Sequence, residues 1–406
     1  MSDQSHSHEP FRDRTPLAEA RARLRERVEP HGRTDTVALG DAVGRVVATR
    51  IESPANVPDY RRAAMDGYAV RAEDTFGASD RSPVVLEETD SDLGPHSARQ
   101  VHTGSELPAD ADAVVMVEET NRAGSEVEIF AAVSEGENVG PVGEDVAAGQ
   151  LLFEPGARLR PSDLGLLKSV GLTEVTVAER PTVSVIPTGE ELVQADPEPG
   201  EIIETNGLTV SKLVETWGGE PTYNDIVTDD EAELEAAITD ALAHDIVVTT
   251  GGSSVGARDL LPEVVSGIGE VFVHGVGLKP GHPVALGVVE GTPVLILPGY
   301  PVSCLVNAVQ FLRPAMAWAG GGSVAQFPTV SARLDEKIYS EPGIRSFARV
   351  KLQEQDGDQV ATAVRASGAG VLSSVALSDG WVVVPEESEG LDAGETVEVQ
   401  RWEGSA

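Results

Sequence analysis

Strand-like and helix-like runs alternate regularly in the second half of the chain. Five β-branched residues stand in a row at Ile246–Thr250, and Thr182–Ile186 and Thr222–Val227 are also expected to be strands. Between these runs, Thr205–Trp217 and Glu231–His244 have the pattern and length of helices. A continuous apolar run is typical of a strand that is buried on both faces. Strands that alternate with helices predict βαβ units and a doubly wound parallel α/β domain.

Two other parts of the chain have a β pattern without long helices. Short β runs with turn signals extend from about residue 57 to 142, and they predict a separate β-rich domain. From Pro328 onward, short alternating runs predict a small all-β domain that resembles a barrel. Its expected strands are Val330–Leu334, Phe347–Leu352, Trp381–Val384 and Thr396–Arg401.

Three helices are expected outside the α/β domain. The first begins at Thr15 and Pro16, with threonine as a cap and proline in the first helical position. A short helix is expected near Leu39–Arg50 and another at Pro161–Val170, and none of the three carries an evident chemical motif. Residues 1–14 are polar and predict a mobile tail.

Glycine, proline or acidic residues mark five turns that follow predicted strands. These turns are Pro187–Glu191, Asp229-Asp230, Gly251–Asp259, Lys279–Pro283 and Pro298–Pro301. Ligands of doubly wound sheets bind outside the carboxyl ends of the strands, so the turns are expected to converge on one site. Glycines, serine hydroxyls and a following helix N-terminus favour an anion at Gly251–Ser254. Read alone, that stretch fits an ordinary strand-to-helix turn equally well.

The charge of the chain excludes several classes of partner. The net charge is −37, the acidic residues are spread along the chain, and only five residues are lysine. Nucleic acid and anionic membranes are therefore not expected as partners. No apolar run approaches the roughly 20 residues that span a bilayer, and the polar start lacks a signal peptide, so a cytoplasmic protein is expected. The single Cys304 excludes a disulfide framework and a cysteine metal cluster.

A surface with this charge is expected to need salt. Like charges repel one another across the surface at low ionic strength, and concentrated salt screens that repulsion. We therefore expect a halophilic protein whose thermal midpoint falls steeply well below about 1 M salt. Thermal unfolding followed from dilute buffer to concentrated KCl tests this expectation, and full stability in dilute buffer would contradict it.

The sequence resembles the molybdopterin molybdenumtransferases, and it is similar to the E domain of gephyrin. Seven motifs in the family's order carry the resemblance. They are A-A-M-D-G-Y-A-V (63–70), H-T-G-S-E-L-P-A-D-A-D-A-V-V-M-V-E-E (102–119), V-G-E-D-V-A-A-G (142–149), P-T-G-E-E-L (187–192), T-G-G-S-S-V-G-A-R-D (250–259), K-P-G-H-P (279–283) and P-G-Y-P-V-S (298–303). Together they span nearly the whole chain after the tail.

The resemblance implies a subunit of four domains and a homodimer with active sites at the subunit interface. After the tail (1–14), it divides the chain into a helical linker domain (15–50 with 146–180), an inserted β-rich domain (51–145), a doubly wound α/β domain (181–326) and a C-terminal β domain (327–406). The α/β domain would resemble the molybdopterin adenylyltransferase of the preceding step, and that enzyme is a potential partner.

The implied reaction joins molybdate to adenylylated molybdopterin and releases AMP, with Mg²⁺ assisting. The motif positions imply catalytic roles for Asp66, Asp145, Glu191, Asp229 and Asp259, of which Asp66, Glu191 and Asp259 would hold the metal. They imply substrate contacts for Thr103, Thr188, Gly251, Gly252, Ser253, Ser254, Lys279, Pro298, Pro301, Arg345, Arg349 and Ser373. The carboxylates would need Mg²⁺ to bind a pyrophosphate and a molybdate dianion, because all of these groups are negatively charged. The lysine and the arginines would bind oxygens of these anions.

The sequence departs from the family pattern at positions that are often basic. Asn138–Val142 is uncharged, Gly275 and His282 stand where lysine is common, and the choice between molybdate and tungstate therefore stays open. Two other functions also stay open. One is molybdopterin adenylyltransferase activity with ATP, and the other is a dimeric scaffold without catalysis.

Overall fold

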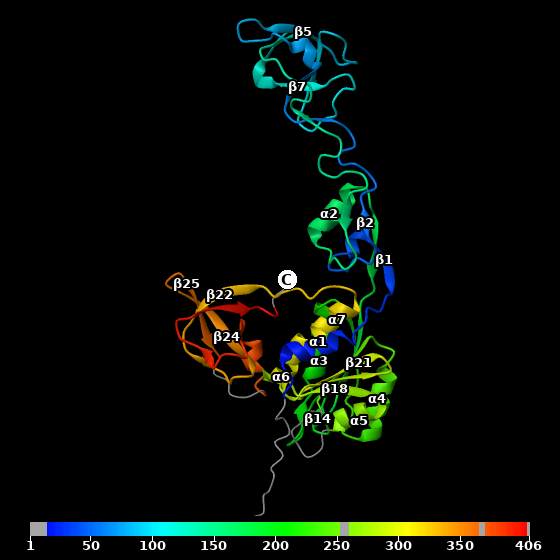
Figure 1. Cartoon of the computed structure of the whole chain (residues 1–406), viewed down its shortest axis with the longest axis vertical. Helices are drawn as coiled ribbons and strands as arrows, with labels where there is room; N and C mark the ends of the chain where they lie inside the picture. The colour runs from blue at the N-terminus through cyan, green and yellow to red at the C-terminus, as the bar shows by residue number, and fades with distance from the viewer. Residues whose placement is uncertain (1–13, 252–259, 365–369, 404–406) are drawn as a thin grey trace, which may run out of the picture. The chain divides into compact units, whose positions relative to one another are not determined.

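The structure is a computed structural model, and it describes residues 14–251, 260–364 and 370–403. The chain forms two compact units (Figure 1). Unit 1 contains residues up to 35, residues 44–46 and residues from 178 onward, whereas unit 2 contains residues 36–43 and 47–177. The finer division into four domains stays a prediction.

A six-stranded sheet forms the centre of unit 1, in the order β16-β13-β17-β21-β20-β18. Its strands are β13 (Thr182–Pro187), β16 (Glu220–Tyr223), β17 (Ile246–Thr250), β18 (Glu270–His274), β20 (Ala285–Val289) and β21 (Thr292–Leu297). Strands β16, β13, β17 and β21 pair in parallel. At one edge, β20 pairs antiparallel with both β21 and β18. The edge reverses because Glu290 and Gly291, both at positive φ, form a two-residue hairpin turn. The predicted doubly wound α/β domain is confirmed, with this antiparallel edge added.

Helices cover both faces of the sheet (Figure 1). One face packs against α1 (Leu17–Arg25), α3 (Asn206–Thr216), α6 (Pro301–Asn307), the π-helical segment η4 (Ala308–Leu312) and α7 (Arg313–Ala319). The other face packs against α4 (Glu231–Ala241) and α5 (Leu260–Ile268). In β17, Ile246 and Val248 enter the first core and Val247 enters the second. The prediction that this strand is buried on both faces is confirmed.

A closed barrel of five strands follows the α/β sheet in the chain. Its members are β22 (Thr329–Leu334), β24 (Arg345–Gln355), β25 (Asp358–Ala363), β26 (Gly380–Val384) and β28 (Thr396–Gln400), with β23 (Ile338–Tyr339), β27 (Gly390–Leu391) and α8 (Ser373–Ala376) beside them. The pairing of β24 with both β25 and β26 closes it. Strand β19 (Leu278–Lys279) extends the barrel by pairing with β24. The predicted barrel-like domain is therefore confirmed.

Unit 2 is built mainly of short strands. One sheet has the order β7-β4-β6-β5-β9-β8, and small two-stranded sheets join β1 to β12, β3 to β10 and β2 to β11. The strands are β1 (Thr34–Ala38), β2 (Ile51–Glu52), β3 (Arg62–Ala63), β4 (Gly67–Val70), β5 (Val84–Glu88), β6 (Ser97–Val101), β7 (Ala113–Met116), β8 (Thr120–Ala123), β9 (Glu126–Ile129), β10 (Val139–Gly140), β11 (Leu151–Phe153) and β12 (Glu174–Ala178). The helical segments are η1 (Leu39–Asp41), η2 (Ala72–Thr75), η3 (Val117–Glu119) and α2 (Pro161–Ser169).

The expected helix near Leu39–Arg50 is wrong. Only the single 3-10 turn η1 forms there, and Gly44 has a φ of +76°, which an α-helix does not accommodate. The first helix begins later than expected, because Pro16 occupies the cap position and no side chain caps the helix.

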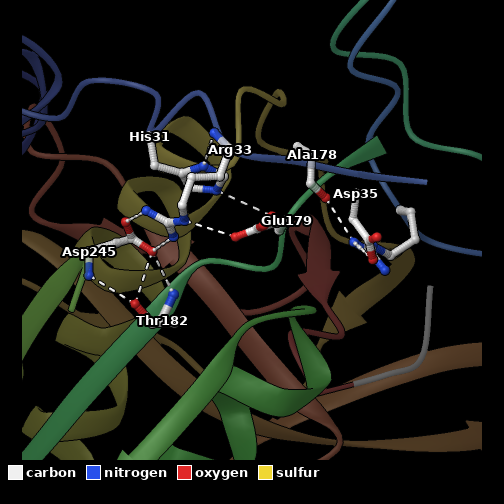
Figure 2. A network of polar contacts seen from close by, with 8 residues as sticks. His31, Arg33, Asp35, Ala178, Glu179, Thr182 and Asp245 are labelled. Carbon is white, nitrogen blue, oxygen red and sulfur yellow. Dashed lines mark hydrogen bonds and ion pairs between the residues drawn. The ribbon is translucent and has the colours of Figure 1, made fainter. Parts of the chain in front are cut away.

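A polar network fixes the segment after α1 to the sheet of unit 1 (Figure 2). The Arg33 guanidinium donates two hydrogen bonds to Asp245, at 2.9 and 2.7 Å, and one to Glu179 at 2.9 Å. Asp245 also accepts hydrogen bonds from the backbone N–H and the hydroxyl of Thr182. Burial alone would raise the pKa of Asp245, but the bonds from Arg33 and Thr182 lower that pKa below its ordinary value.

Asp245→Asn is expected to lower the free energy of unfolding by about 2 kcal/mol at neutral pH, since it weakens charge-assisted hydrogen bonds. A carboxyl group with a lowered folded-state pKa stabilises the fold above its ordinary pKa of about 3.9. The difference between the variant and the wild type is therefore expected to shrink as the pH falls through the folded-state pKa. Urea unfolding at constant high salt measures it, with the exposed Asp240→Asn on α4 as the control.

Candidate functional site

A cavity of about 1310 Å³ lies at the carboxyl end of the parallel strands of unit 1. Its floor is formed where β13, β17 and β21 end, at Thr188, Gly251 and Pro298. Residues 346–349 of the barrel strand β24 line another wall. Among the residues predicted for the site, the cavity wall contains Thr188, Glu191, Asp229, Gly251, Lys279, Pro298, Pro301 and Arg349. Described residues of all five strand-end turns, with Gly251 alone from the third, therefore line one cavity, as expected from the sheet topology.

Backbone bonds bring two acidic turns together at the cavity. Thr188 forms a parallel bridge with Val227, and the N–H of Gly189 donates to the carbonyl of Val227 at 3.1 Å. Glu191 and Asp229 consequently face the same cavity. Burial raises the pKa of Asp229, and the neighbouring carboxylates of Glu191 and Glu190 raise it further. A bound cation would reduce the repulsion between these neighbouring carboxylates.

The acidic turns fit a metal site that the substrate completes. The part of the chain that the structure describes contains no group of three or more metal-binding side chains. Mg²⁺ commonly takes only one or two carboxylates and keeps water and phosphate oxygens as its other ligands. Glu191 and Asp229 can supply such a pair. Asp259, which the sequence also assigns to the metal, lies outside the described residues.

Two residues with buried hydroxyls line the cavity beside a glycine that no other residue could replace. A Cβ at Gly251 would lie 2.1 Å from the carbonyl oxygen of Thr188, so the close approach of β13 and β17 requires glycine. The hydroxyls of Thr188 and Thr250 have no hydrogen-bond partner among the described residues, although both residues are buried. Because both residues line the cavity, their hydroxyls are candidates for contact with a ligand oxygen. The predicted binding residues Gly252, Ser253 and Ser254 lie outside the described part.

Sequence reasoning missed several residues of the cavity wall. Glu204 is buried, accepts a hydrogen bond from the N–H of Gly207 at 2.6 Å and another from the Tyr223 hydroxyl, and so fixes the start of α3. Asn206, the first residue of α3, donates to the carbonyl of Gly299 at 2.7 Å. Thr250 belongs to a quoted motif, but its role depends on burial that the sequence does not show.

Basic side chains approach the cavity from the barrel side. Lys279 lines the cavity and its ammonium group lies 2.9 Å from a carboxylate oxygen of Glu341. Arg349 also lines it, and burial lowers the pKa of its guanidinium. Burial, followed by the charges of Arg14 and Lys279, lowers the pKa of His282, so this residue is neutral at pH 7.

Arg345 and Ser373, also predicted to contact substrate, lie outside the cavity wall. The Arg345 guanidinium donates to Glu386 at 2.6 Å, and Ser373 is the exposed first residue of α8. Their binding roles therefore stay predictions from the motifs.

A second group of predicted residues lies in unit 2. Asp66 accepts hydrogen bonds from the N–H of Thr103 at 2.7 Å and from its hydroxyl at 3.1 Å. The backbone bond, followed by the hydroxyl bond, lowers the pKa of Asp66, so this exposed side chain is ionised. Asp145 is also exposed, and its N–H donates to the carbonyl of Val57 at 3.0 Å. Asp66 and Thr103 thus form one polar pair, while Asp145 is held separately by its backbone.

Comparison with known proteins decides the family. The profile described as the MoeA N-terminal region (domain I and II) matches residues 15–171, a probable molybdopterin binding domain matches 184–318, and the MoeA C-terminal region (domain IV) matches 331–402. The chain belongs to the MoeA family. The resemblance stated from the seven motifs is therefore confirmed.

Individual MoeA relatives match along almost their whole length. A putative molybdopterin biosynthesis protein of Methanocaldococcus jannaschii is 36% identical over 93% of this chain and 94% of its own length. A molybdopterin molybdenumtransferase of Haemophilus influenzae is 33% identical over 95% of this chain and 98% of its own. A solved structure of the molybdopterin biosynthesis moeA protein from Pyrococcus horikoshii has a TM-score of 0.80 and 32% identity, with 96% of this chain and 100% of that one covered.

In the described residues, no helix has the length and apolar character to cross a membrane.

Proposed function

We propose that the chain catalyses the insertion of molybdate into adenylylated molybdopterin, with release of AMP and with Mg²⁺ assisting. It is a molybdopterin molybdenumtransferase, an enzyme of molybdenum cofactor biosynthesis, as its curated relatives are named. The observation that carries the detailed proposal is the cavity of unit 1, in which carboxylates, unpartnered hydroxyls and cations from separate strand ends line one space.

The carboxylates are assigned to the metal. Glu191 and Asp229 would hold Mg²⁺ through their side-chain oxygens, and the ion would neutralise charge on the pyrophosphate as its bond is cleaved. Burial raises the pKa of Asp229 and the charge of Glu191 raises it further, which is the effect expected of two neighbouring carboxylates. The roles of Asp66, Asp145 and Asp259 rest on their motif positions alone.

The hydroxyls and cations are assigned to the anionic groups of the two substrates. Thr188 and Thr250 would donate to oxygens of the pterin substrate at the floor of the cavity. Lys279 would exchange its exposed partner Glu341 for a substrate oxyanion, and Arg349 offers a planar guanidinium for two parallel hydrogen bonds.

One assay tests the proposal. The full chain is incubated with adenylylated molybdopterin, Mg²⁺ and molybdate in concentrated salt, and AMP is followed. AMP release that depends on molybdate supports insertion, and replacement of molybdate by tungstate reports the preferred metal. Consumption of ATP with free molybdopterin would instead indicate adenylyltransferase activity, and inactivity in both assays would favour a scaffold. A homodimer is part of the proposal, and light scattering at the assay salt measures it.

A further inference from the structure

The segment before α1 runs beside the turn that carries Lys279. The N–H of Thr15 donates to the carbonyl of Gly275 at 3.0 Å, and the N–H of Gly277 donates to the carbonyl of Thr15 at 2.9 Å. The carbonyl of Gly277 then accepts from the N–H of Arg345 at 2.9 Å. Three segments that are distant in sequence therefore meet at Gly277.

This meeting point gathers positive charge in a strongly acidic chain. Arg14 directly precedes Thr15, Lys279 lies two residues after Gly277, and Arg345 pairs with Leu278 in the ladder of β19 and β24. Arg21 lies one helical turn after Leu17, whose side chain shares a core with Leu278 and Phe347. We call Arg14, Arg21, Lys279 and Arg345 the cationic surface. A cluster of this kind is notable because the whole chain has 30 basic and 67 acidic residues.

Two carboxylates balance only part of this charge. Glu341 pairs with Lys279, and Glu386 pairs with Arg345. Within residues 14–251, 260–364 and 370–403, no hydrogen bond or ion pair reaches the side chains of Arg14 and Arg21. Four guanidinium or ammonium groups therefore face two carboxylates, and His282 beside them is neutral.

The backbone hydrogen bonds of Thr15 with Gly275 and Gly277 hold Arg14 beside the turn that carries Lys279, and Arg21 follows on α1. Burial lowers the pKa of the partly buried Arg21, and the charge of Arg345 lowers it further. Arg14 acts on the pKa of both Glu341 and His282. Arginine stays protonated in proteins, so two neighbouring guanidinium groups repel each other until an anion lies between or beside them.

We propose that Arg14 and Arg21 bind an oxyanion together with Lys279 and Arg345, so that the N-terminal segment supplies two cations of an anion site beside the cavity, next to the wall residue Lys279. The ligand is a tetrahedral oxyanion, either the molybdate dianion or a singly charged phosphoryl group of the pterin substrate's pyrophosphate, and this assignment rests on the proposed function. Planar guanidinium groups suit such oxygens because each can donate two parallel hydrogen bonds. The helix α1, which lacks any chemical motif, then has a direct part in substrate binding.

Calorimetric titration of the full chain with molybdate alone and with inorganic phosphate alone, at one high salt concentration, tests the inference. Arg14→Gln and Arg21→Gln are each expected to raise the Kd for the bound anion about tenfold, since each removes a charge-assisted contact. The matched control is Arg23→Gln, on the same helix and with the same change of charge, whose guanidinium binds Glu19 and the carbonyl of Phe272. Urea unfolding verifies that all variants fold.

The two anions distinguish the two sources of the ligand. Weaker binding of molybdate with unchanged binding of phosphate assigns the surface to the metal oxyanion, and the reverse assigns it to a substrate phosphate. In the first case, the KM for molybdate rises in the assay while kcat and the KM for the pterin substrate stay near the wild-type values.

Three results would overturn the inference. One is that the Kd values of Arg14→Gln and Arg21→Gln for both anions equal those of the control Arg23→Gln. Another is the absence of binding of either anion to the wild type. The third is a lower molar mass of Arg21→Gln by light scattering with unchanged anion affinity, since Arg21 would then bind a second subunit. Anion binding that needs Arg21 in a chain that releases no AMP would refute the proposed function and leave the inference standing.

Discussion

Asp229→Asn is expected to lower molybdate-dependent AMP release by about 100-fold while the chain keeps its fold. Asp229 lines the cavity beside Glu191, and the amide would remove one anionic ligand from the proposed Mg²⁺ site. The matched control is Asp230→Asn, which changes the adjacent residue in the same way. Asp230 caps α4 by accepting from the N–H groups of Ala232 and Glu233, and asparagine caps a helix equally well.

The pH dependence of the same reaction provides a second measurement. Because burial and Glu191 raise the pKa of Asp229, activity is expected to fall at a higher pH than an ordinary aspartate would cause. Glu191→Gln removes one of the repelling charges and should move this acid limb to lower pH, in addition to weakening Mg²⁺ binding. Equal activity in Asp229→Asn and Asp230→Asn would remove Asp229 from the mechanism.

Lys279→Met is expected to lower kcat/KM for molybdate by about 100-fold, because the proposed contact of this cavity-lining residue's ammonium group with the oxyanion would be lost. The ion pair with Glu341 is exposed, so its loss should leave the free energy of unfolding nearly unchanged. Steady-state kinetics with varied molybdate measures the effect, and urea unfolding checks stability.

Lys212→Met is the control for Lys279. Lys212 forms an equally exposed ion pair, at 2.8 Å from Glu215, on α3. The two variants lose the same charge and the same kind of surface contact, but only Lys279 lines the cavity. If both variants retain wild-type kinetics, the proposed oxyanion contact of Lys279 is wrong.

The sequence predicts those features that repeat along the chain. The β-branched run Ile246–Thr250 coincides with β17 to the residue, because burial on both faces favours β-branched residues throughout the strand, the buried threonines included. Parallel strand ends necessarily share an edge, so the convergence of Glu191, Asp229 and Lys279 on one cavity also follows from the pattern.

Features that depend on pairing between distant residues do not follow from the pattern. The Tyr223 hydroxyl donates to Glu204 across 19 residues, and Thr250 becomes a candidate ligand only because its hydroxyl is buried without a described partner. The helix expected near Leu39–Arg50 fails for the opposite reason, since its valines have helical spacing but Gly44 adopts a positive φ. Arg21 becomes a candidate anion ligand only in the folded chain, where the charge of Arg345 acts on it.

The anchor between Arg33 and Asp245 also determines the order in which the protein can assemble during synthesis. The two residues are 212 positions apart, and all of residues 47–177 lie between them in the chain. All of unit 2 has therefore been synthesised before Asp245, the partner of Arg33, leaves the ribosome. Until then α1 has no sheet to cover, and its apolar face, including Leu17 and Leu24, must stay exposed or be covered by a chaperone. The apolar face of α1 at the N-terminal end of the nascent chain therefore stays without its core partners until the later strands of unit 1 have been synthesised.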